Sequence, residues 1–110
     1  MRLWLLNARD KPNALELRKA TRDAHRAYIY RKDLPAEMVF GSPLLDEGGE
    51  MCGTWLVLMA AEKSDVEAFS AGDPYVHAGL FQSIEILEVH PTFDWEPKVE
   101  NLRKQLDGST

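Results

Sequence analysis

The chain has 110 residues, of which 45% are hydrophobic and 28% charged, a composition typical of one globular domain. Its formal net charge of −5 argues against binding to a nucleic-acid backbone, which requires a basic face. Cys52 is the single cysteine and cannot form an internal disulfide, and the apolar run at residues 3–6 is too short for a signal peptide or a membrane span. These features predict a soluble cytoplasmic protein that binds neither nucleic acid nor membrane.

The first third of the chain predicts a strand followed by a helix. Residues 3–6 form a continuous apolar run, which is typical of a strand buried on both faces. A helix is predicted from Pro12 to about Arg31. Its predicted buried stripe consists of residues at helical spacing, namely Leu17, Ala20, Thr21, Ala24 and Tyr28. His25 lies at the edge of this stripe, where its ring could face a cleft, whereas Arg18 is predicted to lie off it.

Three further strands are predicted at residues 37–42, 51–61 and 81–90, with Pro43 ending the first of them. The capping-box pattern at Ser64–Glu67 predicts a helix that ends near Gly72. The order strand, helix, strand, strand, helix, strand is that of the ferredoxin-like fold. This α+β fold has an antiparallel four-stranded sheet with both helices on one face.

A very short helix is predicted between the second long helix and the last strand. Asp73 has the properties of an N-cap and Pro74 those of a first helical residue, while Gly79 can adopt the left-handed conformation that ends a helix. Asp73 is therefore expected at the mouth of this helix. A carboxylate fixed there could reach a histidine on another helix.

The predicted sheet has a second apolar face that requires a cover. The first and third strands are apolar on both faces, but the helices of this fold cover only one. The simplest cover is the same face of a second copy, which predicts a homodimer through the sheet faces. The alternative cover is the chain's own tail. We expect a domain at residues 1–90 and an extension at residues 91–110 with a short amphipathic helix, whose apolar stripe is Val99, Leu102 and Leu106.

His25 and Asp73 are the candidate catalytic residues. An imidazole is well suited to general-base catalysis near neutral pH, and a carboxylate partner fixes its tautomer. Thr54 and Ser42, near the ends of neighbouring strands, could supply hydroxyl groups to the same cleft, and Tyr75 could form part of its wall. The structural alternative is that Asp73 serves only as a cap and that His25 is simply packed.

Four short motifs follow one another within residues 1–90. They are Arg22-Asp23-Ala24-His25, Gly41-Ser42, Gly53-Thr54 and Asp73-Pro74-Tyr75-Val76-His77-Ala78-Gly79-Leu80-Phe81. Over this range the chain resembles the YciI-like (YCII-related) family of small proteins, and the last motif is the most specific. The chain departs from the family pattern at Thr54, where a serine is usual, and in its longer tail beyond His90.

The resemblance implies a ferredoxin-like fold assembled as a dimeric α/β barrel, with His25 and Asp73 as the active-site pair. It also implies a reaction class, because a few relatives look like dehydrochlorinases or related lyases acting on ring compounds. Thr54 keeps the hydroxyl group that the usual serine would supply. The longer tail could alter substrate access.

Three functions remain open on this basis. The first is a cofactor-independent lyase or isomerase acting on a small substrate, with His25 as general base and Asp73 as its partner. The second is a non-catalytic small-molecule-binding or dimeric assembly module, and the third is a cofactor-free oxygenase. No metal site is predicted, because the histidines and Cys52 show no close ligand spacing.

Overall fold

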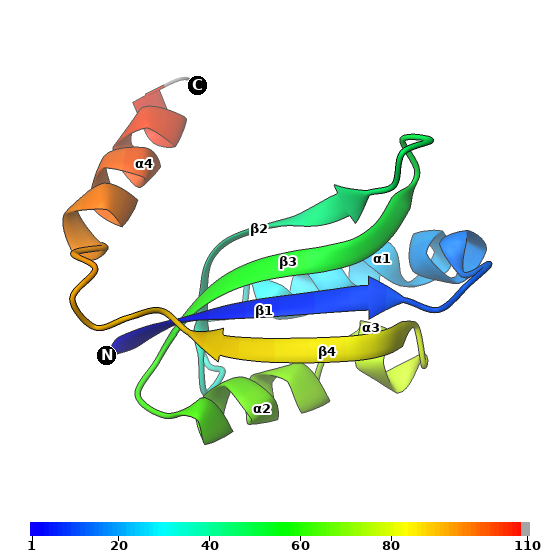
Figure 1. Ribbon diagram of the computed structural model, residues 1–110, viewed down its shortest axis with the longest axis horizontal. Helices are drawn as coiled ribbons and strands as arrows, with labels where there is room; N and C mark the ends of the chain where they lie inside the picture. The colour runs from blue at the N-terminus through cyan, green and yellow to red at the C-terminus, as the bar shows by residue number, and fades with distance from the viewer. Residues whose placement is uncertain (109–110) are drawn as a thin grey trace.

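The protein is an α+β sandwich of one sheet and one helical layer, seen in a computed structural model that describes residues 1–108. The elements in chain order are β1 (Arg2–Asp10), α1 (Leu15–Ile29), β2 (Glu37–Leu45), β3 (Met51–Ala60), α2 (Lys63–Ala71), α3 (Pro74–His77), β4 (Phe81–Glu88) and α4 (Glu96–Gly108). The sheet order is β2-β3-β1-β4, and every neighbouring pair of strands is antiparallel. Figure 1 shows α1 behind β1 and β3, and α2 below β4 in this view. The predicted ferredoxin-like fold is thus confirmed.

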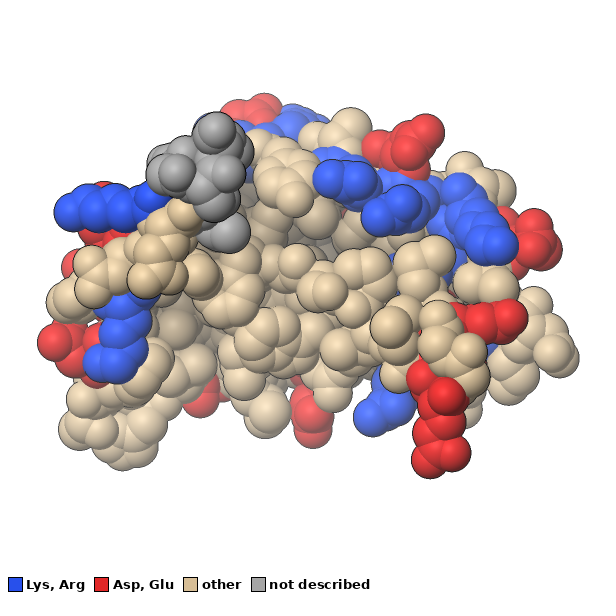
Figure 2. Space-filling view, turned by 90° about the horizontal axis from the view of Figure 1, so that it is seen from above, with Lys and Arg blue, Asp and Glu red and all other residues tan. Residues whose placement is uncertain are grey.

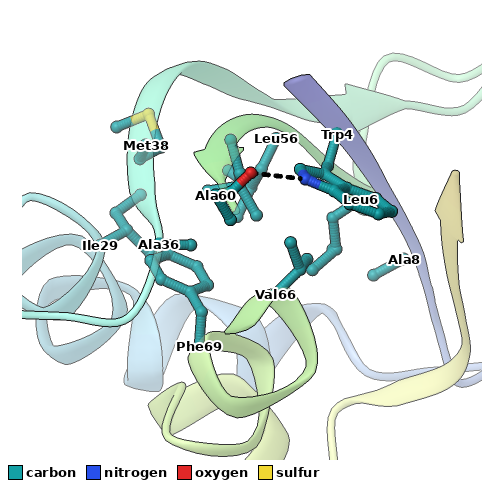
Figure 3. Packing of buried hydrophobic residues seen from close by; sticks show 11 residues of the cluster. Trp4, Leu6, Ala8, Ile29, Ala36, Met38, Leu56, Ala60, Val66 and Phe69 are labelled. Carbon is teal, nitrogen blue, oxygen red and sulfur yellow. Dashed lines mark hydrogen bonds between the residues drawn. The ribbon is translucent and has the colours of Figure 1, made fainter. Parts of the chain in front are cut away.

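The inner face of the sheet forms the core with the helices. Trp4 and Leu6 of β1 lie beside Leu56 and Ala60 of β3, and Val66 of α2 packs against them (Figure 3). The indole N–H of Trp4 donates to the Ala60 carbonyl at 3.1 Å, which satisfies a polar group inside this apolar layer. The core therefore fixes α2 against β1 and β3, and with it the chain that leads into α3.

The predicted buried stripe of α1 is wrong at three of its five positions. Leu17, Ala20 and Ala24 are exposed, and the buried residues of this helix are Arg18, His25 and Ile29. The helix is rotated relative to the prediction because its inward face carries polar groups that bond to other elements. A hydrophobic pattern counts only apolar side chains, so it selected the wrong face.

Two element boundaries also differ from the prediction. Strand β2 continues through Pro43, which is paired with Thr54, to Leu45. Proline is tolerated there because β2 is an edge strand, which need not use every backbone N–H in the ladder. Helix α2 begins at Lys63, and the side chain of Asp65 accepts from the backbone N–H of Glu62 at 3.1 Å, so the cap lies two residues earlier than Ser64.

The outer face of the sheet is covered in part by the tail. Leu3 and Val57 on this face are buried, as is Val99 of α4, and an apolar groove of about 280 Å³ lies between the sheet and the tail. Figure 1 shows α4 at one end of the sheet only. Leu87, which is paired with Leu5 on the outer face, remains 49% exposed. The side chain of Leu106, in the predicted stripe, lies outside the described part of the structure.

Within residues 1–108, no helix combines the length and apolar character that crossing a membrane would require.

Candidate active site

The structure brings His25 and Asp73 together although 48 positions separate them in the chain. His25 lies on the inward face of α1, and Asp73 precedes α3. The imidazole Nδ1 is 2.8 Å from Oδ1 and 3.0 Å from Oδ2 of the carboxylate. Both side chains are buried, with exposed fractions of 7% for His25 and 5% for Asp73. The pair is therefore a short, shielded interaction between two separate elements.

The position of Asp73 follows from local sequence. Its Oδ1 accepts a hydrogen bond from the backbone N–H of Tyr75 at 2.9 Å, and Pro74 occupies the first turn of α3. Gly79 has a φ of +73°, the left-handed conformation that ends the turn after α3. One carboxylate therefore caps α3 and binds His25 at the same time. The structural and the catalytic interpretation of Asp73 are compatible.

The carboxylate determines where the proton of the neutral imidazole lies. An ionised carboxylate can only accept, so Nδ1 donates to Asp73 and Nε2 keeps an unprotonated lone pair. Among the described residues, Nε2 has no hydrogen-bond partner. His25 also lines a cavity of about 150 Å³ between α1 and strands β2 and β3. The Nε2 atom of His25 can therefore accept a proton from a molecule in the cavity.

Tyr75 forms one wall of the cavity. Its ring stacks on the imidazole of His25, with centroids 4.0 Å apart and an interplanar angle of 17°. Burial raises the pKa of Tyr75, and this effect outweighs the opposite pull of the nearby Arg18 and Arg22 guanidinium groups. Tyr75 is therefore a neutral phenol and can donate its O–H group.

Arg18 is a site residue that the sequence prediction missed. Its guanidinium donates to both carboxylate oxygens of Asp10, at 2.7 and 2.9 Å, and to Oγ1 of Thr54 at 2.7 Å. It also lies 3.5 Å from the Tyr75 hydroxyl. Because Thr54 and Tyr75 both accept from the same cation, each hydroxyl keeps its own proton for a partner in the cavity. One feature of the sequence could have indicated this role. Arg18, Arg22 and Arg26 recur at four-residue spacing, which places them on the same side of the helix, and His25 lies on that helix as well.

The five predicted site residues have different positions relative to the cavity. His25, Thr54 and Tyr75 line it and are buried, while Asp73 lies behind His25 and supports it. Ser42 lies among the lining residues, but its side chain is exposed and its hydroxyl donates to the Pro43 carbonyl at 2.8 Å. Strand register pairs Ser42 with Trp55, one position away from Thr54.

A metal centre would require several ligating side chains in one place. Among the residues whose side chains the structure describes, no group of three or more His, Cys, Asp or Glu has this arrangement.

A family model describes most of the chain. The model of the YCII-related domain matches residues 2–90. The chain belongs to the YCII-related family. The resemblance inferred from the four motifs is thereby confirmed, and the match ends before α4. No curated protein matches the sequence.

Solved structures extend this comparison. The YCII-related chain resembles a 5-chloro-2-hydroxyhydroquinone dehydrochlorinase (TftG) from Burkholderia phenoliruptrix, solved in complex with 2,5-dihydroxybenzoquinone. The two share 28% sequence identity with a TM-score of 0.69, over 80% of this chain and 93% of the dehydrochlorinase.

Two more distant structures share the fold alone. One is an antibiotic biosynthesis monooxygenase with a TM-score of 0.53 and 9% identity, over 84% of this chain and 99% of that one. The other is a NIPSNAP domain protein from Burkholderia xenovorans with a TM-score of 0.51 and 12% identity, over 86% of this chain and 97% of that one.

Proposed function

We propose that this YCII-related protein is a cofactor-independent lyase or isomerase that acts on a small ring compound. His25 is the general base and Asp73 is the positioning residue that holds the imidazole. The observation that carries this proposal is the orientation of His25, whose Nδ1 is bonded to Asp73 while the ring lines a cavity. A cavity of about 150 Å³ has room for one six-membered ring.

The proposed reaction needs only a base and hydrogen-bond donors. In an elimination, Nε2 of His25 takes a proton from a ring carbon or a hydroxyl oxygen of the substrate. The electron pair released forms a new double bond, and the leaving group departs with its own electron pair. The Thr54 and Tyr75 hydroxyls stabilise negative charge that develops on a substrate oxygen, while Asp73 stabilises the imidazolium. In an isomerisation the imidazolium returns the proton at another atom.

The comparison with the dehydrochlorinase supports this reaction class. Its name describes removal of chloride from a hydroxylated ring, and it was solved with a hydroxylated quinone. The two chains align over most of their length, so the same class of substrate is the first to test here. The cytoplasmic location predicted from the sequence belongs to the same proposal.

The decisive experiment replaces His25 by Asn. Turnover is measured as chloride release from a panel of chlorinated hydroquinones, and oxygen uptake is followed in parallel to detect an oxygenase. We expect His25→Asn to lower kcat by about 10²–10⁴-fold, the usual contribution of a general base. His77→Asn is the matched control, because His77 is exposed and its ring nitrogen contacts only the Ala71 carbonyl among the described residues. A His25→Asn protein with the parental rate would exclude this mechanism.

A non-catalytic binding module is the second candidate. The hydrogen bond from Tyr75 N–H to Asp73 favours it, since that bond alone is a sufficient structural role for the carboxylate. On this account the parent protein binds ring compounds without turning them over, and His25→Asn changes affinity only.

We also propose a homodimer through the outer sheet faces. The exposed Leu87 and the apolar groove beside Trp55 and Phe40 support it, because the single chain leaves this apolar surface partly open. The tail at residues 91–110 is proposed as a separate extension that borders this interface, because Val99 of α4 packs at one end of the same face.

A further inference from the structure

The cavity beside His25 carries an excess of positive charge. Arg18, Arg22 and Arg26 all line it, and they lie at four-residue spacing along one face of α1. No aspartate or glutamate is among the described lining residues. Figure 2 shows Lys and Arg side chains gathered on the side of the molecule where α1 lies. The chain as a whole has a net charge of −5, so this local sign is opposite to that of the protein.

Two of these three charges are unpaired. Arg18 is neutralised by the bidentate bond to Asp10, and both side chains are almost fully buried. In contrast, Arg22 and Arg26 have no carboxylate within 4.0 Å among the described residues. The Arg22 guanidinium acts on the site itself, because it pulls the pKa of Tyr75 downward against the effect of burial.

Unpaired arginines at this spacing have an energetic cost. Like charges four residues apart on a helix repel each other. A negatively charged ligand between them would be attracted to both arginines and would offset this repulsion. Arginine is well suited to such a ligand, because its planar group of donors matches the two oxygens of a carboxylate. The overall negative charge of the protein would otherwise disfavour the entry of an anion.

We propose that the cavity binds an anionic ring compound, with its carboxylate or phenolate oxygen at Arg22 and Arg26 and its ring beside the Nε2 atom of His25. This inference deepens the proposed function and rests on it for the identity of the base. The two arginines are specificity residues that select the charged form of the substrate. They also stabilise the further negative charge that appears when His25 removes a proton.

Binding of simple probes tests the inference without turnover. Benzoate and benzamide have nearly the same shape but differ in charge, so titration calorimetry at constant ionic strength isolates the charge effect. We expect the parent protein to bind benzoate about tenfold or more tightly than benzamide, as charge-assisted hydrogen bonds imply. A phenolate probe, 4-nitrophenolate, then distinguishes a site for either oxyanion from one restricted to carboxylates. Binding of both oxyanions and binding of the carboxylate alone each support an anion site.

The variants are matched in charge. The double variant Arg22→Gln/Arg26→Gln is expected to lose the preference for benzoate, whereas Lys19→Gln/Lys32→Gln is expected to keep it. This control also removes two positive charges, but from lysines that do not line the cavity. Equal binding of the two probes by the parent protein, binding of neither, or a preference that survives in the arginine variant would overturn the inference.

The outcome is separable from that of the proposed function. His25→Asn is expected to keep the preference for benzoate while losing turnover. If His25→Asn loses turnover and the arginine variant still prefers benzoate, only the anion site is excluded. If His25→Asn keeps full turnover and the arginine variant loses the preference, only the assignment of the base is excluded.

Discussion

At the scale of single residues, the Asp73 carboxylate joins two parts of the molecule. Its Oδ1 accepts from the Tyr75 backbone, and both of its oxygens lie within 3.0 Å of the His25 ring nitrogen. The cap holds the carboxylate still, so the imidazole meets a partner that is already in place before a substrate arrives. This is the preorganisation that a general base requires.

The two roles of Asp73 can be separated by substitution. Asp73→Asn keeps an oxygen to cap α3 but can present an N–H group to Nδ1, which favours the unproductive imidazole tautomer. We expect kcat to fall by about 10²-fold or more with little change in stability. Asp73→Ala also removes the cap and should lower the free energy of unfolding by about 1 kcal/mol more. Turnover assays and urea unfolding check both outcomes, and an Asp73→Asn protein with parental kcat would contradict the positioning role.

Arg18 gives a second prediction at this scale. Its side chain and that of Asp10 are 2% and 6% exposed, so removing one charge leaves the other buried without a partner. We expect Arg18→Met to lower the free energy of unfolding by about 3–5 kcal/mol. The double variant Arg18→Met/Asp10→Leu should recover much of this loss, because it buries no charge.

Arg31→Ala is the control for Arg18, because Arg31 pairs with Asp33 at 2.7 Å on the surface and the pair is largely exposed. It should change little in urea unfolding. A loss in Arg18→Met no larger than that of the control would show that the buried pair does not stabilise the fold.

These residues also show what a sequence can reveal about a site. Asp73 was predictable, because capping is a local rule that fixes one side chain relative to its own backbone. The contact of Asp73 with His25 was a hypothesis from the sequence, since nothing local joins two elements 48 positions apart. Arg18 was missed because a charged residue is assigned to solvent by pattern, although an acidic partner can hold it inside.

At the scale of elements, the close approach of β1 and β3 depends on Gly53. A Cβ atom at this position would lie 2.6 Å from the Ala8 carbonyl oxygen, a backbone atom that cannot move without shifting the strand. We expect Gly53→Ala to lower the free energy of unfolding by about 1–3 kcal/mol. Gly48→Ala in the β2–β3 turn is the control, because its nearest neighbour is the exposed side chain of Asp46. Equal urea midpoints for the two variants would contradict this account.

The extent of the elements was only partly predictable. Each strand was located from the sequence, yet β1 extends to Asp10 and β2 to Leu45, beyond the predicted ends. Both extensions matter for the site, since β1 carries Asp10 to Arg18 and β2 carries Pro43 past Thr54. Whether polar residues belong to a strand depends on how they pair with the neighbouring strand, and a single sequence does not show that pairing.

At the scale of the whole molecule, association of two copies is the open prediction. Leu87 lies on the outer face of β4, and Leu17 lies on the solvent side of α1. If sheet faces stack, Leu87→Glu should convert a dimer to a monomer, while Leu17→Glu should leave the dimer intact. Sedimentation equilibrium measures the mass of each variant. A parent protein that sediments as a monomer would exclude the dimer and leave the tail as the cover of this face.

The ferredoxin-like fold was predictable at this scale from the order of strands and helices alone. The cover of the outer face was not, because an apolar surface indicates burial without identifying the partner. The sequence named the tail as the alternative cover, and the structure places α4 over part of this face, with Val99 buried and bordering the groove with Leu3 and Val57.

His25 and Asp73 come from different halves of the chain. The imidazole belongs to the strand–helix–strand unit before the Asp46–Glu50 turn, and the carboxylate belongs to the unit after it. A protease cut in that exposed turn would leave a lone base on one fragment and a lone acid on the other. Neither piece could reproduce the dyad, so its formation reports that both halves of the protein have docked.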